Sequence, residues 1–297
     1  MEELFNRCNL CPRGCNVNRN NDEVGYCGAS NKMKIGGYRL HMWEEPIISG
    51  NRGSGTIFFS YCNLRCVYCQ NYDISTKYIG DEISVERFAS ICIELQDKGA
   101  HNINLVTPSH YIPLIRDGII LAKKRGVDIP FVYNSSGYDS VSSLKLLEGL
   151  IDIYLPDFKY YDSSLFKYSN VNNYFDVASL AIEEMYRQVG KSKYDGDILK
   201  SGVIVRHLVL PRCFKDSKKI IKYLYDKYGD NIIISIMNQY TPVRKTKYAE
   251  LNSCVKENEY DDVINYAYDL GVRNAFIQEN SSQSDSFIPI FKGDEIV

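Results

Sequence analysis

The chain has 297 residues, of which 44% are hydrophobic and 24% are charged, and its formal net charge is −2. This composition excludes global disorder, and the near-neutral charge gives no reason to expect non-specific binding to nucleic acid or an anionic membrane. No apolar run approaches the roughly 20 residues of a membrane-spanning helix. The N-terminus starts with acidic residues and lacks the apolar stretch of a secretory signal, so we expect a cytoplasmic protein without a membrane or nucleic-acid partner.

Two regions of the chain differ in composition and in the pattern of their apolar residues. Residues 1–50 are rich in Asn, Gly, Arg and Cys and have no sustained helical or strand period, which predicts a small irregular module held by ligands rather than by a core. From Thr56 onward, short apolar runs alternate with amphipathic segments, which is typical of repeated β-α units around a parallel sheet. We therefore expect a cysteine-rich module over residues 1–50 and an α/β core over residues 51–297.

Most of the expected strands are apolar throughout, as is typical of strands buried on both faces. They cover residues 56–60, 102–107, 130–134, 151–155, 203–210, 232–237 and 274–278. Ser84 can cap the first expected helix, which ends at Gly99, and Cys92 lies on its apolar face. Further helices are expected over residues 112–125, 141–150, 174–189, 217–228 and 259–270, and a surface loop over residues 190–202. Such units curl into a full or partial barrel that binds ligands at the carboxyl ends of its strands.

Three cysteines directly follow the first core strand. Cys62, Cys66 and Cys69 form a C-x3-C-x2-C array, with Tyr68 before the last cysteine. A cytosolic chain of this length keeps its cysteines reduced, so clustered cysteines indicate a metal. Three thiolates can bind three irons of a four-iron cluster and leave the fourth iron open, whereas electron-transfer clusters use four cysteines. The alternatives are a zinc site completed by a distant His and three cysteines that lie close by chance.

This array resembles the cluster motif of the radical S-adenosylmethionine (SAM) superfamily, C-x3-C-x-aromatic-C after the first barrel strand. Cys62, Cys66, Tyr68 and Cys69 match it position by position. The resemblance implies a partial (β/α)6-type barrel and an oxidoreductase whose open iron binds the amino and carboxylate groups of SAM, with Tyr68 beside the cofactors. Reduction would cleave SAM to methionine and a 5′-deoxyadenosyl radical, which abstracts hydrogen from a substrate, while the protein supplies orientation and a dry cavity.

Further segments resemble the branch of pyruvate formate-lyase-activating-enzyme homologues, and the similarity covers nearly the whole chain. They are residues 44–60, 106–110, 157–159, 206–211 and 237–242. This branch implies a glycyl radical enzyme as the partner substrate and a flavodoxin- or ferredoxin-type electron donor. The alternatives are a radical SAM enzyme that modifies a small molecule or another macromolecule, and a non-catalytic iron–sulfur redox or sensor protein. The three-cysteine loop argues against the sensor, because no fourth protein ligand lies near it in the sequence.

The chain departs from the activases after the second core strand. Many activases have Gly-Gly-Glu there, which holds the amino group of SAM, whereas Ser109 and His110 follow this strand here. The Ser109 hydroxyl or the His110 ring could supply the missing contact, and His110 could equally be a structural histidine.

The ends of the next two strands match the family better. Asn134-Ser-Ser-Gly resembles the Asp-Thr-Asn-Gly of activases, so Asn134 and Ser136 are expected to bind the cofactor. Asp157-Phe-Lys resembles Asp-Leu-Lys, which implies that Asp157 and Lys159 face the SAM or substrate pocket, where an ammonium can meet a carboxylate. The alternative for this pair is a solvated ion pair beyond the strand.

Four other residues remain open between a functional and a structural role. Arg206 and His207 alternate along an apolar strand, so only one points inward, and Arg206 matches an activase arginine expected in the pocket; its alternative is an ion pair with a structural acid. Asn238 could bind the cofactor or form the turn after the sixth strand. Glu44 and Glu45 could act as a carboxylate pair or pack the N-terminal module against the barrel.

The N-terminal module holds a second set of cysteines, Cys8, Cys11, Cys15 and Cys27, with Gly and Pro turns between them. Four thiolates at this spacing suit either tetrahedral zinc or a saturated four-iron cluster, and the spacing does not separate the two. The remaining alternative is that these cysteines bind no metal. We expect a structural metal here, because the module has too little apolar sequence to fold on burial alone.

Overall fold

The computed structural model describes residues 3–278 and residue 291. Its centre is a curved sheet in which, among the described residues, seven strands run parallel to one another. These are β2 (Ser54–Phe59), β4 (Ile103–Val106), β5 (Phe131–Ser135), β6 (Ile153–Pro156), β8 (Ile198–Leu208), β9 (Ile233–Met237) and β10 (Ala275–Ile277). They neighbour one another in chain order, which confirms the expected α/β fold with a partial, open parallel barrel.

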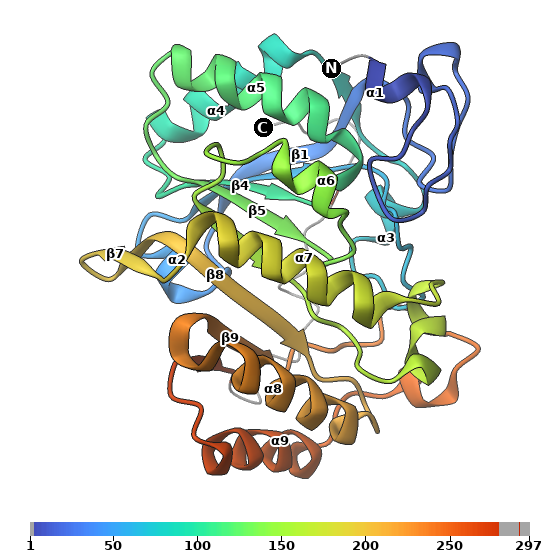
Figure 1. Cartoon of the computed structure of the whole chain (residues 1–297), viewed down its shortest axis with the longest axis vertical. Helices are drawn as coiled ribbons and strands as arrows, with labels where there is room; N and C mark the ends of the chain where they lie inside the picture. Colours follow the sequence, from blue (N-terminus) through green and yellow to red (C-terminus); the bar gives the residue numbers. More distant parts are fainter. Residues whose placement is uncertain (1–2, 279–290, 292–297) are drawn as a thin grey trace.

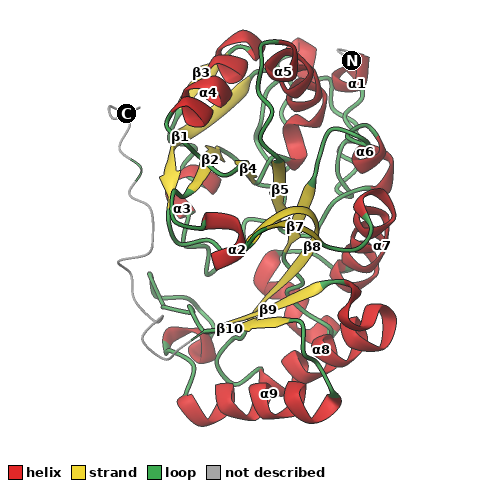
Figure 2. Cartoon of the chain, turned by 90° about the vertical axis from the view of Figure 1, so that its left-hand side faces the viewer, coloured by secondary structure: helices red, strands yellow, loops and turns green. Residues whose placement is uncertain are grey.

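Helices cover the outer side of this sheet (Figures 1 and 2). They are α4 (Val85–Asp97), α5 (Ile112–Lys124), α6 (Val141–Lys145), α7 (Tyr174–Val189), α8 (Phe214–Tyr228) and α9 (Glu257–Leu270). The first begins where the sequence predicts, because the Ser84 hydroxyl accepts a hydrogen bond from the backbone N–H of Arg87. Cys92 is fully buried on the inner face of α4, as its spacing indicates. The predicted helix over residues 141–150 is too long, since α6 ends at Lys145.

A short helix, α2 (Pro46–Ser49), closes the amino-terminal end of the barrel. Its Ile48 packs in a small apolar cluster with residues near the starts of the facing strands, such as Val132, Ile153 and Ile233. Figure 2 shows α2 on the concave side of the sheet. With this end filled by apolar side chains, polar groups gather at the opposite, carboxyl end of the strands.

Two strands lie where the sequence predicts irregular structure. β1 (Met33–His41) pairs antiparallel with β2 and with β3 (Asp81–Ile83), so it extends the parallel sheet at one edge. The expectation of an irregular segment through residue 50 is therefore wrong for β1, whereas the division of the chain at residue 50 stays a prediction. β7 (Lys193–Asp195) forms a hairpin with β8 inside the predicted surface loop, and its residues are exposed.

The remaining elements are short. They are α1 (Glu3–Asn6), α3 (Tyr72–Ser75), η1 (Arg19–Asn21), η2 (Ser109–Tyr111), η3 (Ser163–Ser169), η4 (Gly229–Asn231) and η5 (Ala249–Asn252). Among the described residues, no helix has both the length and the apolar content needed to cross a bilayer.

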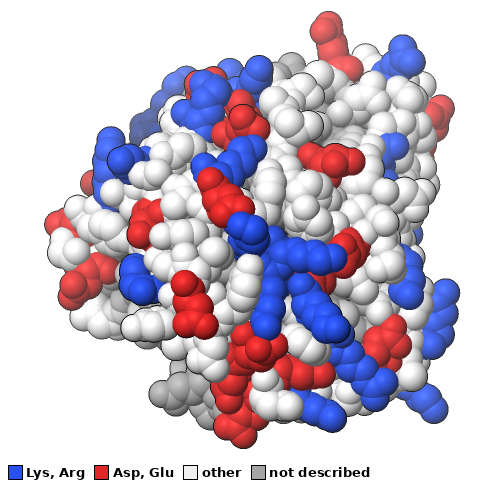
Figure 3. All heavy atoms as spheres, turned by 60° about the horizontal axis from the view of Figure 1, so that its bottom comes forward, with Lys and Arg blue, Asp and Glu red and all other residues white. Residues whose placement is uncertain are grey.

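Charges of both signs share the surface in Figure 3. On α8, several lysines form ion pairs with acids, among them Lys218 with Asp262 and Lys227 with Glu183. The basic side chains are thus partly neutralised by neighbours, in keeping with the near-zero net charge.

Candidate functional site

The three-cysteine loop leaves the carboxyl end of β2 and makes two sharp turns. Tyr61 and Arg65 lie in the left-handed region, with φ of 73° and 56°. Cys62 and Cys66 are buried and Cys69 is partly buried. The loop is thus packed into the protein at the edge of the sheet where parallel α/β folds bind their ligands.

Each sulfur atom of the loop has a polar neighbour. The backbone N–H of Leu64 donates to Cys62 Sγ at 3.4 Å, and the Ser75 hydroxyl donates to Cys69 Sγ at 3.4 Å. Cys66 Sγ lies 2.8 Å from the hydroxyl of Ser169. Such hydrogen bonds stabilise thiolate ligands and tune the potential of an iron–sulfur cluster.

The arrangement of the three sulfurs fits a cluster better than a single ion. Burial raises the pKa of the Cys66 thiol to about 12 and also raises the pKa of Cys69, so iron must displace protons when it binds. Among the described residues, no three Cys, His, Asp or Glu side chains converge closely enough to hold one metal ion. A four-iron cluster needs no such convergence, because each thiolate binds a different iron.

A chain of hydroxyl groups leads from Cys66 to the predicted cofactor neighbour Tyr68. Ser169 Oγ, which contacts Cys66 Sγ, lies 2.7 Å from the hydroxyl of Tyr160, and the Tyr160 hydroxyl lies 2.7 Å from that of Tyr68. The three hydroxyl-bearing residues are buried. This chain joins one predicted cluster ligand to a side chain at the wall of the neighbouring cavity.

A cavity of about 510 Å³ opens beside the loop at the carboxyl ends of the strands. Cys66, Tyr68 and Cys69 line it on the loop side. The sheet contributes four of the predicted site residues to the same lining, namely Asn134, Asp157, Lys159 and Arg206. With Glu44 and Glu45, which also line it, nine of the residues singled out in the sequence thus meet in one cavity.

The charged side chains of the cavity form one connected network. Arg206 donates from Nε to Asp157 at 3.0 Å, from one terminal nitrogen to Glu44 at 3.2 Å and from the other to Asn134 at 2.6 Å. Lys159 Nζ donates to the second oxygen of Asp157 at 2.6 Å. Asp157 is therefore held by two cations, and the Arg206 guanidinium is fixed by three acceptors.

The network keeps Asp157 and Lys159 in their charged forms. Burial by itself would raise the pKa of Asp157, but Lys159 and Arg206 hold that pKa below its usual value. Burial would lower the pKa of Lys159, yet Asp157 and Cys66 raise it above its usual value. For Glu44, burial raises the pKa even though Arg206 opposes the shift. The site therefore presents a charged ammonium and an ionised Asp157 to the cavity.

Glu44 is a site residue whose partners the sequence did not identify. Its carboxylate accepts hydrogen bonds from Asn104 at 2.9 Å and from Arg206, which lies 162 residues away in the chain. The adjacent Glu45 is also buried and lines the cavity. The acidic pair after β1 was the only sequence signal for this wall of the site.

The other predicted cofactor residues lie outside the described lining of this cavity. Ser109 accepts a hydrogen bond from the buried Tyr133 at 3.3 Å, and Ser136 is partly buried after β5. Asn238 is fully buried, and its backbone N–H donates to the side chain of Gln278. The roles expected for these residues stay predictions.

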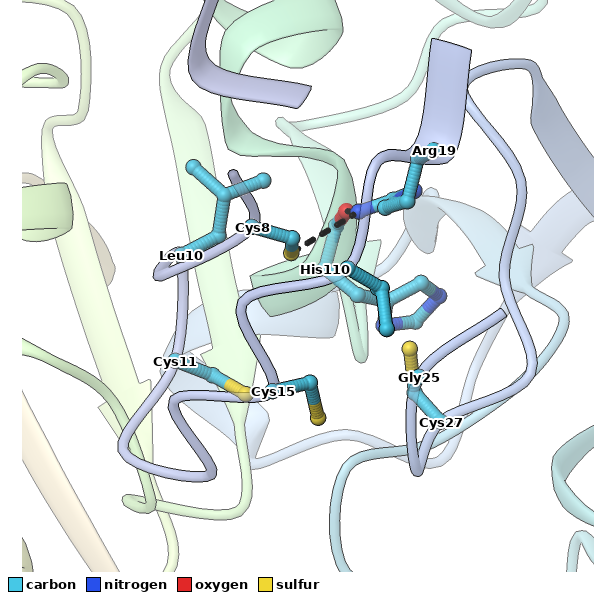
Figure 4. Close-up of a pocket in the computed structure, with 9 residues that line it drawn as sticks. Cys8, Leu10, Cys11, Cys15, Arg19, Gly25, Cys27 and His110 are labelled. Atoms are coloured by element: carbon cyan, nitrogen blue, oxygen red, sulfur yellow. Dashed lines mark hydrogen bonds between the residues drawn. The ribbon is translucent and has the colours of Figure 1, made fainter. Parts of the chain in front are cut away.

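His110 lines a different cavity, together with Cys8, Cys11, Cys15 and Cys27. Figure 4 shows the four cysteine side chains around one space, with His110 and Arg19 beside it. Burial and the nearby Arg19 lower the pKa of His110 to about 3, so its ring is neutral. The structure therefore places His110 in the lining of the cavity shared by the N-terminal cysteines, while its Nε2 contacts the carbonyl of Ser60 just before the three-cysteine loop, and its expected cofactor role stays a prediction.

Comparison with known proteins identifies one domain of the chain. The model of the radical SAM superfamily matches residues 56–194. An uncharacterized protein of Methanocaldococcus jannaschii, MJ0674, is 31% identical over 282 residues, which cover 90% of this chain and 75% of that protein.

The solved structure of SuiB shares the fold at low sequence identity. SuiB of Streptococcus suis, bound to its precursor peptide SuiA, superposes with a TM-score of 0.50 at 13% identity, over 73% of this chain and 46% of SuiB. Methylornithine synthase (PylB) gives a TM-score of 0.47 at 14% identity, over 70% of this chain and 59% of that protein. The chain spans about half the length of these proteins, and the likeness to SuiB concerns the fold alone. The cluster loop lies within the matched segment, so residues 56–194 are a domain of the radical SAM superfamily, whose cofactors are a four-iron cluster and SAM.

Proposed function

We propose that the protein cleaves SAM reductively at a four-iron cluster held by Cys62, Cys66 and Cys69, and that the 5′-deoxyadenosyl radical abstracts a hydrogen atom from a substrate in the adjoining cavity. One observation carries this proposal: Cys66 and Cys69 line the same cavity as the ammonium group of Lys159. An open iron and a cation able to bind a carboxylate are what an amino acid cofactor such as SAM requires.

The chemistry is a one-electron reduction followed by hydrogen transfer. When bound, the reduced cluster supplies one electron to SAM, which breaks the bond between sulfur and the 5′ carbon and gives methionine and the radical. The 5′-deoxyadenosyl radical would then take one hydrogen atom from the substrate, which would become a radical while 5′-deoxyadenosine forms. The protein encloses these events in a cavity whose walls hold fixed charges, which limits side reactions with water.

Lys159 is the residue with capacity to bind the carboxylate of SAM. An ammonium group has three donors, and Asp157 takes one of them at 2.6 Å. The remaining donors can bind a carboxylate that enters the cavity. We assign Lys159 to the methionyl carboxylate of SAM or to an acidic group of the substrate.

Arg206 acts as a positioning residue. Its Nε and both terminal nitrogens already donate to Asp157, Glu44 and Asn134. It holds Asp157 in the orientation that Lys159 needs, and it also stabilises the buried Glu44.

The sequence resemblance favours a glycyl radical enzyme as the substrate, with a flavodoxin or ferredoxin as electron donor. The alternative is a small molecule, a peptide or another macromolecule that enters the cavity. Deuterium transfer distinguishes these substrates: deuterium from the correct labelled candidate appears in 5′-deoxyadenosine, and deuterium from the others does not.

Anaerobic SAM cleavage tests the proposed reaction. Reconstituted protein with dithionite and SAM should release 5′-deoxyadenosine, measured by liquid chromatography and mass spectrometry. Cys66→Ala should reduce the release to background, because the cluster loses one of its three ligands. Cys254→Ala is the matched control, since Cys254 is exposed, and it should cleave SAM at the wild-type rate. Equal release by wild type and Cys66→Ala would disprove the assignment of the cluster, and no release by either protein would favour a redox or sensor role.

A further inference from the structure

The N-terminal cysteines lie on tight turns of one segment, residues 8–27, which we call the knuckle. The backbone N–H of Cys8 donates to the carbonyl of Val17, and the N–H of Gly14 donates to the carbonyl of Cys11. Gly25 leaves room for the sulfur of Cys15: a Cβ atom at Gly25 would lie 2.9 Å from Cys15 Sγ. The backbone of the knuckle therefore passes close to a cysteine sulfur.

Two of these sulfurs each have a hydrogen-bond donor beside them. The backbone N–H of Tyr26 donates to Cys15 Sγ at 3.3 Å, and the guanidinium of Arg19 lies 3.8 Å from Cys8 Sγ. Arg19 is 1% exposed, so its positive charge is buried beside the cysteines. Its guanidinium donates to the carbonyls of Ser30 and His110, and thiolates bound to a metal would add the negative charge that stabilises a buried cation.

A buried ring nitrogen in the same cavity also lacks a partner. His110 is 1% exposed, and its Nε2 donates to the carbonyl of Ser60 at 2.8 Å. Its Nδ1 has no hydrogen-bond partner among the described residues. His110 lines the cavity that the four cysteines share, so an unpartnered polar atom accompanies the sulfurs. Buried polar atoms without partners are rare. Because Nε2 carries the proton, Nδ1 can only accept, so its partner has to be a donor such as a water molecule beside the bound group.

Four thiolates can bind either zinc or a four-iron cluster. Zinc bound to four thiolates at about 2.3 Å brings the sulfurs to within about 4 Å of one another. Among the described residues, no three ligands converge in this way. A four-iron cluster does not require that convergence, because each thiolate binds a different iron.

We propose that Cys8, Cys11, Cys15 and Cys27 bind a second four-iron cluster, with one thiolate on each iron. His110 and Arg19 lie beside this cluster as its buried polar neighbours. All of its irons have protein ligands, so it has no position for SAM. The proposal is independent of the reaction at the three-cysteine loop.

The knuckle also contacts the three-cysteine loop directly. Arg13, between two of the cysteines, donates to the carbonyl of Asn63 at 2.8 Å and to that of Asn170 at 2.7 Å. The Tyr26 hydroxyl donates to the carbonyl of Leu64 at 3.1 Å. A second cluster that orders the knuckle therefore also supports the loop that holds the first.

Metal analysis of the full chain tests the proposal without any SAM cleavage. The wild type, reconstituted anaerobically, should contain about eight irons and eight sulfides per chain, because two four-iron clusters are present. Cys11→Ala combined with Cys15→Ala should halve both counts, and Cys254→Ala should leave them unchanged. About four irons in the wild type, or one zinc per chain that the double variant loses, would overturn the proposal.

A second variant keeps the test decisive if the double variant does not fold. The combined change of Cys62, Cys66 and Cys69 to Ala removes the ligands in the loop and leaves the knuckle intact. Its Mössbauer spectrum should show one four-iron cluster, and SAM should not change that spectrum. A triple variant without iron would disprove the second cluster. Loss of SAM cleavage alone would instead concern the proposed function.

Discussion

The two cysteine regions of this protein contact each other, yet their surroundings differ. The loop with Cys62, Cys66 and Cys69 lines a cavity of about 510 Å³ together with charged side chains. The N-terminal knuckle encloses a space for about one water molecule. Three thiolates leave one iron of a four-iron cluster open beside the larger cavity, whereas four thiolates occupy every iron. The number of cysteines and the position of the larger cavity therefore both assign substrate binding to the loop.

The largest expected difference between the regions is their response to SAM. In the double variant of Cys11 and Cys15, the electron paramagnetic resonance signal of the reduced loop cluster should persist. The whole of this signal should change when SAM is added. In the triple variant of the loop cysteines, the remaining signal should not change at all. The physical reason is that only the loop leaves an iron without a protein ligand. A response to SAM in the triple variant would contradict the comparison.

A smaller effect is expected at the charged wall of the cavity. Lys159→Ala should raise the KM for SAM, or for an acidic substrate, about tenfold or more, because a hydrogen bond to a charged group contributes about 1.5–3 kcal/mol. Lys159→Arg, which keeps the charge, should recover part of the loss. The iron content should equal that of the wild type in both variants. Unchanged kinetics in Lys159→Ala would place its ammonium group outside the binding site.

The smallest effect is expected at the contact between the regions. Arg13→Ala removes hydrogen bonds to the loop and should lower the free energy of unfolding by about 1–3 kcal/mol. Arg7→Ala is a matched control, because Arg7 donates to Asn16 at the exposed surface of the knuckle. Denaturant unfolding of the iron-loaded proteins measures both effects. If the two variants lose the same stability, Arg13 does not link the regions.

The sequence predicted the parallel core well, because buried parallel strands are short apolar runs and their helices repeat apolar residues at helical spacing. β1 was missed, since Gly36, Gly37 and partly buried polar residues interrupt its apolar pattern, and its pairing with β2 and β3 shows that it is a strand. β7 was missed because all three of its residues are exposed.

The candidate site was predictable where its functional residues lie close to one another in the sequence. The cysteine spacing and the pair Asp157 and Lys159 at a strand end gave their positions directly. The contact of Glu44 with Arg206 could not be read from the sequence, because 162 residues separate them. The position of His110 beside the N-terminal cysteines likewise depends on the packing of the module against the end of β4.

The hydroxyl chain from Cys66 to Tyr68 has a direction that depends on whether iron is bound. A free Cys66 thiol has a hydrogen to donate, whereas an iron-bound thiolate only accepts, so Ser169 must then donate to it. Each hydroxyl has one hydrogen, so Tyr160 must donate to Ser169, and Tyr68 must donate to Tyr160. In the loaded protein the Tyr68 oxygen therefore offers only lone pairs to the cavity, and any polar group of SAM or substrate that contacts it has to be a donor.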